Sequence, residues 1–217
     1  IYAGTRGGIF KSNDNGNSWI SITSGLEPQD CNAIFSTGTN LFAGFGREYS
    51  LGGLFYSNNG GSSWNSIVSN INSCMVQNMI VKGSTLYACV NGSGIHKSPD
   101  GGNTWVRCVN GLPPNALRFE TDFIASDGQN LYYNIPGNFY RSTDDGNNWT
   151  LYNGFSFTPR FISNNNNIAY AGTSQGIYYS SNFGNNWILL GLQNISINSI
   201  DFYNQNIYAG TSRGVYE

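Results

Sequence analysis

The acidic side chains are the residues of this chain that could support hydrolysis. A pair of carboxylates facing one cleft can act on a glycosidic bond as general acid and as base or nucleophile. The chain of 217 residues contains twelve Asp and Glu residues. Asp14, Asp100, Asp144 and Asp145 fall within a repeated sequence, where we expect them to serve turns. The others are Glu27, Asp30, Glu48, Glu120, Asp122, Asp127, Asp201 and Glu217. No spacing among them marks a catalytic pair, so we expect no enzyme.

Other reactive groups are few. The single histidine, His96, precedes Lys97 and Ser98 in an expected strand, so we predict a strand residue that faces solvent or packs, and not a base. Without a C-x-x-C motif, and with one histidine, we expect no zinc site. A calcium loop would need further oxygen ligands and a closing Glu, which are missing. We therefore expect no metal and no cofactor.

The cysteines leave the disulfide state open. Four cysteines allow three full pairings. Cys31 and Cys74 follow their tryptophans at similar distances, so these two could lie near each other, whereas Cys89 in an apolar strand reads as a buried thiol. The four are Cys31, Cys74, Cys89 and Cys108.

One cassette, Ser-x-Asp/Asn-x-Gly-x-x-Trp, occurs five times and contains all five tryptophans of the chain. The Asp or Asn side chain can bond to backbone amides of a turn, and the glycine can adopt positive φ. The tryptophan then anchors the following strand. Asn59 and Asn182 replace the acid in two copies, which favours a structural turn over chemistry. The cassette residues are Ser12, Asp14, Gly16, Trp19; Ser57, Asn59, Gly61, Trp64; Ser98, Asp100, Gly102, Trp105; Ser142, Asp144, Gly146, Trp149; and Ser180, Asn182, Gly184, Trp187.

The elements around the cassette are short strands. The tryptophans are separated by 45, 41, 44 and 38 residues, a period typical of repeated supersecondary units. Each repeat carries a Tyr-Ala-Gly-like strand, a Gly-apolar-aromatic strand before the cassette, a short strand after Trp, and a strand leading to the next repeat. Such four-stranded antiparallel meanders are typical of β-propeller blades. We predict an all-β propeller with the cassettes between third and fourth strands.

The number of blades follows from the two ends of the repeat pattern. Six Tyr-Ala-Gly-like strands accompany five cassettes, which allows five or six blades. We expect six, with the first and the last blade each one strand short. Residues 1–217 are then expected to form a single propeller domain, alone or within a longer repeat array.

Composition argues against several partners. Hydrophobic residues make up 39% of the chain and charged residues only 10%, with a net charge of -2. The absence of a basic run predicts no nucleic-acid partner, and no apolar stretch reaches the length of a membrane span. Asn, Ser, Thr and Gly must therefore supply most of the surface.

The cassette resembles the Asp-box, or bacterial neuraminidase repeat. With the Tyr-Ala-Gly-Thr and Gly-Leu-Pro elements, the whole chain resembles Asp-box propellers of the photosystem II assembly factor-like and sialidase-superfamily kinds. The resemblance implies the fold but not one function, because sialidases, xyloglucanases, sorting receptors and adhesive modules share the box. Sialidases use three arginines, a Tyr nucleophile assisted by Glu and an Asp acid, and carry an Arg-Ile-Pro near their start. This chain has no Arg-Ile-Pro and no arginine triad assignable by motif.

Variable loops are the expected binding sites, because they sit on a rigid scaffold. The longest connection between second and third strands carries Arg47, Glu48 and Tyr49, which together could grip a polar ligand or sugar. The competing interpretation is a solvated loop whose Arg and Glu pair weakly. A second set of candidate ligand-binding residues follows a later loop and consists of Arg118, Glu120 and Asp122.

The sequence favours a non-catalytic binding or scaffold module, secreted or on the cell surface, with the periplasm as an alternative location. Its expected partner is a protein or a glycan, without membrane insertion. One alternative is a glycoside hydrolase of sialidase or xyloglucanase type, or a fragment of one. Another is a structural repeat of a surface assembly, in which edge strands pair with neighbouring chains or repeats.

Overall fold

The described residues of the computed structural model form β-strands joined by turns. They cover residues 1–26, 30–37, 40–46, 52–67, 75–114, 123–135, 138–203 and 206–217. The chain divides into two compact units, Ile1–Ile124 and Ala125–Glu217. None of the described residues belongs to a helix long and apolar enough to cross a bilayer.

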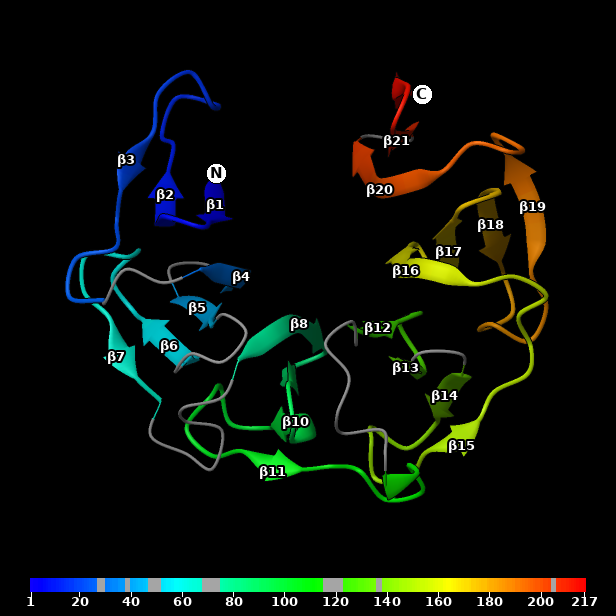
Figure 1. The fold of residues 1–217 in the computed structure, drawn as a ribbon, viewed down its shortest axis with the longest axis horizontal. Coiled ribbons are helices and arrows are strands. Elements are labelled where there is room, and N and C mark those ends of the chain that lie inside the picture. Colours follow the sequence, from blue (N-terminus) through cyan, green and yellow to red (C-terminus); the bar gives the residue numbers. More distant parts are fainter. Residues whose placement is uncertain are drawn as a thin grey trace. The chain divides into compact units, whose positions relative to one another are not determined.

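Three antiparallel sheets account for the strands of the first unit, and in each the strands follow one another in chain order (Figure 1). The first sheet has three strands and the next two have four. They are β1 (Tyr2–Thr5), β2 (Gly8–Lys11) and β3 (Ile20–Ser21); β4 (Cys31–Thr37), β5 (Asn40–Phe45), β6 (Gly53–Ser57) and β7 (Asn65–Ser66); and β8 (Val76–Lys82), β9 (Thr85–Val90), β10 (Gly94–Ser98) and β11 (Val106–Arg107).

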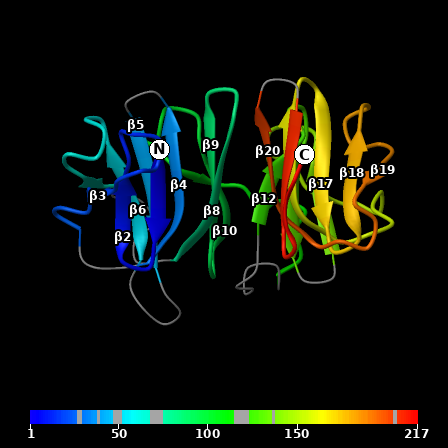
Figure 2. The same cartoon turned by 90° about the horizontal axis from the view of Figure 1, so that it is seen from above.

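The second unit repeats this pattern with two four-stranded sheets and a last sheet of three strands, apart from the start of β12, which belongs to the first unit. Figure 2 shows β17, β18 and β19 side by side. The strands are β12 (Phe123–Ser126), β13 (Leu131–Ile135), β14 (Asn138–Ser142) and β15 (Thr150–Leu151); β16 (Pro159–Asn165), β17 (Ile168–Thr173), β18 (Gly176–Ser180) and β19 (Ile188–Gly191); and β20 (Ile197–Tyr203), β21 (Asn206–Thr211) and β22 (Gly214–Tyr216).

The six sheets are the blades of a β-propeller. Among the described residues the first sheet lacks the strand that opens each middle blade, and the last sheet lacks the strand that closes it. The prediction of an all-β propeller with six blades and two incomplete end blades is therefore confirmed. The cassettes lie between the third and fourth strands, as in the connection from β10 to β11.

Burial explains why the second strands read as almost continuously apolar. In β5, β9 and β17, every residue after the first is buried, on both faces of the strand. A strand covered on both faces cannot alternate apolar and polar residues as a half-exposed strand does. The short fourth strands are instead exposed, and Ile20, Val106 and Ile188 leave more than half of their surface to solvent.

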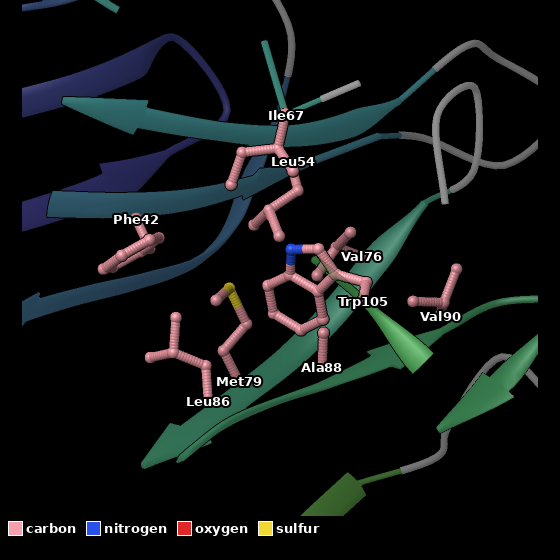
Figure 3. Packing of buried hydrophobic residues seen from close by; sticks show 9 residues of the cluster. All are labelled: Phe42, Leu54, Ile67, Val76, Met79, Leu86, Ala88, Val90 and Trp105. Atoms are coloured by element: carbon pink, nitrogen blue, oxygen red, sulfur yellow. The ribbon is translucent and has the colours of Figure 1, made fainter. Parts of the chain in front are cut away.

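The tryptophan of the third cassette shows how neighbouring blades pack. Trp105 is 7% exposed and lies in one apolar cluster with residues of two successive blades (Figure 3). Leu54 and Ile67 belong to the blade before it, and Leu86 and Ala88 to its own blade. A large ring thus fills the space between two sheets, where its burial stabilises their contact.

Candidate functional site

The six binding candidates named from the sequence, Arg47, Glu48, Tyr49, Arg118, Glu120 and Asp122, lie outside the described residues. They remain predictions. The described part of the chain offers three other places where chemistry or binding could reside: the cassettes, the buried polar residues, and the surface pockets.

In the first cassette the polar side chains bond to one another and to the turn. The Asp14 carboxylate accepts a hydrogen bond from the Ser12 hydroxyl at 2.8 Å and from the Ser18 backbone amide at 2.8 Å. The Ser12 hydroxyl accepts in turn from the Gly16 amide at 2.7 Å. The same contacts hold the cassettes of Asp100 and Asp144.

The two cassettes with asparagine keep this geometry. The Asn59 carbonyl oxygen accepts from the Ser57 hydroxyl at 2.9 Å and from the Ser63 amide at 3.0 Å. The Asn182 oxygen accepts from the Ser180 hydroxyl at 3.0 Å and from the Asn186 amide at 2.9 Å. The turn therefore requires an acceptor oxygen at this position, and not a charge.

The cassette acids are poorly suited to acid catalysis. Hydrogen bonds lower the pKa of Asp14, Asp100 and Asp144 from 3.8 to about 2. The largest cause is a hydrogen bond from the side chain four positions later, and the second is one from the backbone amide of the same residue. These groups are ionised at neutral pH, whereas a general acid must hold a proton there. Their observed contacts give them a role in closing the turn.

Asp127 is a buried acid that the sequence left without a role. It is 1% exposed, and its carboxylate accepts from the Asn130 amide at 2.6 Å and from the Tyr132 hydroxyl at 2.8 Å. The Asn130 side chain and the Gln129 amide add two more hydrogen bonds. Burial is the largest cause that raises the pKa of Tyr132, and the negative charge of Asp127 is the second. A carboxylate bonded in this way holds the turn between β12 and β13.

The described histidine and cysteines are buried. His96 is fully covered. It is therefore the packed strand residue, which was one of the two predicted alternatives, and not the solvent-facing one. Burial lowers its pKa from 6.5 to about 4. Cys31, Cys89 and Cys108 are buried thiols, and burial raises the pKa of Cys31 and Cys108 to about 12. Cys74 lies outside the described residues. Buried thiols that stay protonated are unreactive in the folded chain, and the covered ring of His96 has no access to solvent.

The aromatic pocket of the second unit is the strongest candidate for binding. It has a volume of about 430 Å³ and lies where the start of β14 meets the connection from β15 to β16. None of its described lining residues is charged. They are Asn138, Phe139, Leu151, Tyr152, Asn153, Phe155, Ser156, Phe157 and Thr158.

Ring contacts fix the walls of the aromatic pocket. Phe155 packs against the rings of Phe139 and Tyr152, with 4.9 Å between centroids in both pairs. Phe157 stacks on Tyr178 at 3.9 Å. Rings held in this way present a preformed apolar surface, and the amide and hydroxyl groups beside them can donate and accept hydrogen bonds.

The sequence contains a signal for this pocket in the connection that follows the fourth strand. In four of the five connections after a fourth strand, a Gly is followed by an apolar residue, which is Leu26, Leu112 or Leu192 in other blades and Phe155 here, whereas the second repeat has Asn70-Ile71. A second aromatic residue, Phe157, follows two positions later. The exchange of an aliphatic residue for two aromatic ones marks this connection as different from the others.

Neither a protein-family model nor a curated protein sequence matches the chain. Solved structures do. A structure titled YCF48 bound to D1 peptide aligns with a TM-score of 0.70 at 14% identity, over 97% of this chain and 71% of that one. An ancestral GH74 enzyme aligns with a TM-score of 0.70 at 19% identity, over 97% of this chain and 36% of the enzyme.

A third similar structure is the extracellular domain of a protein described as a one-component system of B. thetaiotaomicron. It has a TM-score of 0.71 at 15% identity, over 100% of this chain and 30% of that one. The chain thus spans about a third of the length of two of these proteins. At such identities the likeness establishes the propeller fold alone.

Proposed function

We propose that this chain is a non-catalytic binding module that takes an uncharged segment of a partner protein in the aromatic pocket. The observation that carries the proposal is the combination of fixed rings and neutral polar groups around one 430 Å³ pocket. Rigid aromatic residues supply contact area at a small cost in conformational entropy, while amides and hydroxyls satisfy the backbone of a bound segment.

The similar structures support a protein partner. One of them is described as bound to a peptide, and another is the extracellular domain of a protein described as a one-component system. The low charge of the chain, 10% Asp, Glu, Lys and Arg, suits a module that works outside the cytoplasm. A glycan is the second ligand class that this pocket chemistry fits, since sugar rings also pair apolar faces with hydroxyl groups.

A glycoside hydrolase is the alternative function, and the likeness to an ancestral GH74 enzyme favours it. Such an enzyme needs two carboxylates separated by about 5 to 9.5 Å across a cleft. The aromatic pocket has no acid among its described lining residues, whereas two other pockets each have one, Glu217 and Asp100. Binding without hydrolysis is therefore the function that the described geometry supports best.

The test uses a random peptide display library and a glycan array, followed by titration of the best ligands. Ser156→Arg places a long charged side chain into the pocket from an exposed position, and Asn153→Ala removes a polar group from its rim. We expect uncharged peptides to bind, and Ser156→Arg to weaken them by at least about tenfold. Tyr203→Ser is the control, because Tyr203 is 69% exposed and lines none of the described pockets.

Two results would contradict the proposal. One is ligand binding that survives Ser156→Arg unchanged. The other is turnover of an oligosaccharide by the purified chain that a single Asp or Glu substitution abolishes, which would establish the hydrolase instead.

A further inference from the structure

A polar pocket of the first unit lies between the second and third blades and has an acid on its wall. It has a volume of about 460 Å³, and residues of β6, of β7 and of the third cassette line it (Figure 1). None of its described lining residues is Lys, Arg or His. We call it the Asp100 pocket. Its residues with polar groups in their side chains are Asn40, Tyr56, Asn65, Ser66, Asp100 and Asn103.

The Asp100 carboxylate can accept one more hydrogen bond. Its Oδ1 accepts from the Ser98 hydroxyl at 2.8 Å and from the Thr104 amide at 2.9 Å, and its Oδ2 accepts from the Thr104 hydroxyl at 2.6 Å. A carboxylate has about four acceptor sites, so these three described donors leave one on Oδ2. Because the pKa of Asp100 is about 2, the group is negatively charged at neutral pH. An exposed anion with an acceptor site left favours a cationic donor.

The first two blades show what can occupy the equivalent place. Lys11 in β2 corresponds to Tyr56 in β6, since each is the fourth residue of its strand. A Cβ added to Gly60, the fourth residue of the second cassette, would stand 3.7 Å from the Lys11 ammonium nitrogen. A Cβ added to Gly101, the fourth residue of the third cassette, would meet no atom of the described residues within 4 Å. The space that an ammonium takes up beside the second cassette is therefore open beside the third.

The second unit places a guanidinium in a similar way. Arg141 is the fourth residue of β14, and its guanidinium donates to Oδ1 of Asn185 at 3.2 Å. Asn185 is the sixth residue of the fifth cassette, the place that Asn103 has in the third. The guanidinium also lies 4.9 Å from the centroid of the Tyr152 ring. Two blade pairs thus each direct one of the chain's own cations to the cassette that follows.

The charge of the receiving cassette differs between these places. Lys11 and Arg141 reach cassettes whose third residue is neutral. These third residues are Asn59 and Asn182. The Asp100 pocket has the opposite arrangement, with a neutral tyrosine on the strand and a carboxylate on the cassette. Because no cation lies among its described lining residues, the pocket is complementary to a cation supplied by another molecule.

A guanidinium is the cation that this pocket fits best. It carries five donors in one plane, so it can donate to a carboxylate oxygen and to an amide oxygen. Asn103 uses its amide nitrogen to donate to the Asp100 carbonyl oxygen at 2.7 Å, and its side-chain oxygen is the acceptor equivalent to the one that Arg141 uses in the second unit. The Tyr56 ring can attract the cation, and Ile67 can cover an aliphatic stem.

We propose that the Asp100 pocket binds the guanidinium group of an arginine side chain of a partner protein, with Tyr56, Asp100 and Asn103 as its contacts. The pocket belongs to the first unit and the aromatic pocket to the second. The interaction is therefore separate from the proposed function and goes beyond it.

The test is an NMR titration of the isotope-labelled chain, in which the backbone amides of residues 100–104 report binding. The probe is the capped peptide acetyl-Gly-Arg-Gly-amide. The control peptide carries citrulline, which has the shape of arginine without the charge. Methylguanidinium, which lacks the aliphatic stem, is the third probe and shows whether a free small cation is sufficient.

Three protein variants accompany the titration. Asp100→Asn removes the charge and keeps the acceptor oxygen, which closes the turn in two other cassettes. Asp14→Asn is the matched control, because it makes the same change in a cassette that does not line this pocket. Tyr56→Lys places an ammonium at the position that Lys11 holds in β2, so it should compete with the ligand.

We expect the arginine peptide to bind to the unchanged protein. The dissociation constant should be at least about fivefold higher for the citrulline peptide, for Asp100→Asn and for Tyr56→Lys, and within about twofold for Asp14→Asn. Methylguanidinium should bind at least about threefold more weakly than the peptide, because it lacks the stem.

Four results would overturn the proposal. The first is absence of binding, and the second is equal binding of the arginine and citrulline peptides. The third is an equal effect of Asp14→Asn and Asp100→Asn, which would point to net charge and not to the pocket. The fourth is methylguanidinium binding as tight as that of the peptide, which would assign the pocket to a free small cation.

Discussion

The indole nitrogen of Trp64 donates a hydrogen bond of 2.7 Å to the carbonyl oxygen of Ile22, a residue of the preceding blade 42 positions away. The bond joins two sheets through a side chain that also packs against the apolar cluster of Ile9, Ile22 and Leu41. Trp64, like Trp105, is therefore a contact between blades as well as part of a turn.

Replacement of this tryptophan should weaken the first unit. Trp64→Phe keeps a ring but removes the donor, which leaves the Ile22 carbonyl without this partner. We expect the free energy of unfolding to fall by about 1–3 kcal/mol, measured by denaturant unfolding. Trp19→Phe is the matched control, because Trp19 is 42% exposed and its indole nitrogen donates within its own cassette, to the Gly16 carbonyl. Equal losses in the two variants would contradict the bridging role of Trp64.

The cassette serine should matter more than the charge of the cassette acid. Ser142 is 1% exposed, and its hydroxyl accepts from the Gly146 amide at 2.9 Å. Ser142→Ala leaves that amide without its acceptor and should lower the free energy of unfolding by about 1–3 kcal/mol. Asp144→Asn should have a much smaller effect, because Asn59 and Asn182 make the same turn. If the charge were required, Asp144→Asn would lower the melting temperature more than Ser142→Ala in a thermal unfolding series.

Stability should fall as the pH drops from about 6.5 to 4. The pKa of His96 is about 4 in the folded chain and 6.5 as its ordinary value, chiefly because the ring is buried. In this range the unfolded chain takes up a proton that the folded chain does not, so the stabilisation present above pH 6.5 is lost, by about 2–3 kcal/mol.

The variant His96→Phe tests this origin of the pH dependence. Phe55 occupies the equivalent third position of β6, so the fold accommodates a phenyl ring in this place. Unfolding measured at several pH values should show a flatter slope between pH 6.5 and 4 in the variant. The cassette acids, with pKa values of about 2, weaken the fold only at pH values below 3.8. An unchanged slope would exclude His96 as the cause.

Phe183 holds a backbone conformation that suits asparagine better. Its φ is 54°, whereas the same cassette position holds Asn15 at 59° and Gly60 at 67°. A bulky residue in this region is strained, and asparagine tolerates it. Phe183→Asn should raise the free energy of unfolding by about 0.5–1 kcal/mol. The reverse exchange, Asn15→Phe, should lower it by a similar amount, and a loss of stability in both variants would refute this explanation.

Two thiols should resist alkylation in the folded chain. Cys31 and Cys108 are buried, and their pKa values of about 12 leave almost no thiolate at neutral pH. Iodoacetamide labelling followed by peptide mass spectrometry should modify both slowly in buffer and rapidly in guanidinium chloride. Fast labelling of either residue under native conditions would show that its site opens readily.

The repeated part of this protein can be read directly from the order of its amino acids. The spacing of the tryptophans, the strands between them and the six Tyr-Ala-Gly-like segments predicted six antiparallel sheets with two incomplete ends, and the structure has these sheets. The reason is that each blade is a local unit. Ser12, Asp14 and Gly16 bond within four positions, so their pattern can be read along the chain.

Which repeat carries a pocket follows only from the folded chain. The aromatic pocket depends on Phe155 and Phe157 meeting rings from other strands. The burial of His96, which fixes its charge, likewise arises from packing. Such properties belong to side chains brought together from distant positions, and no local pattern specifies which neighbours they will have.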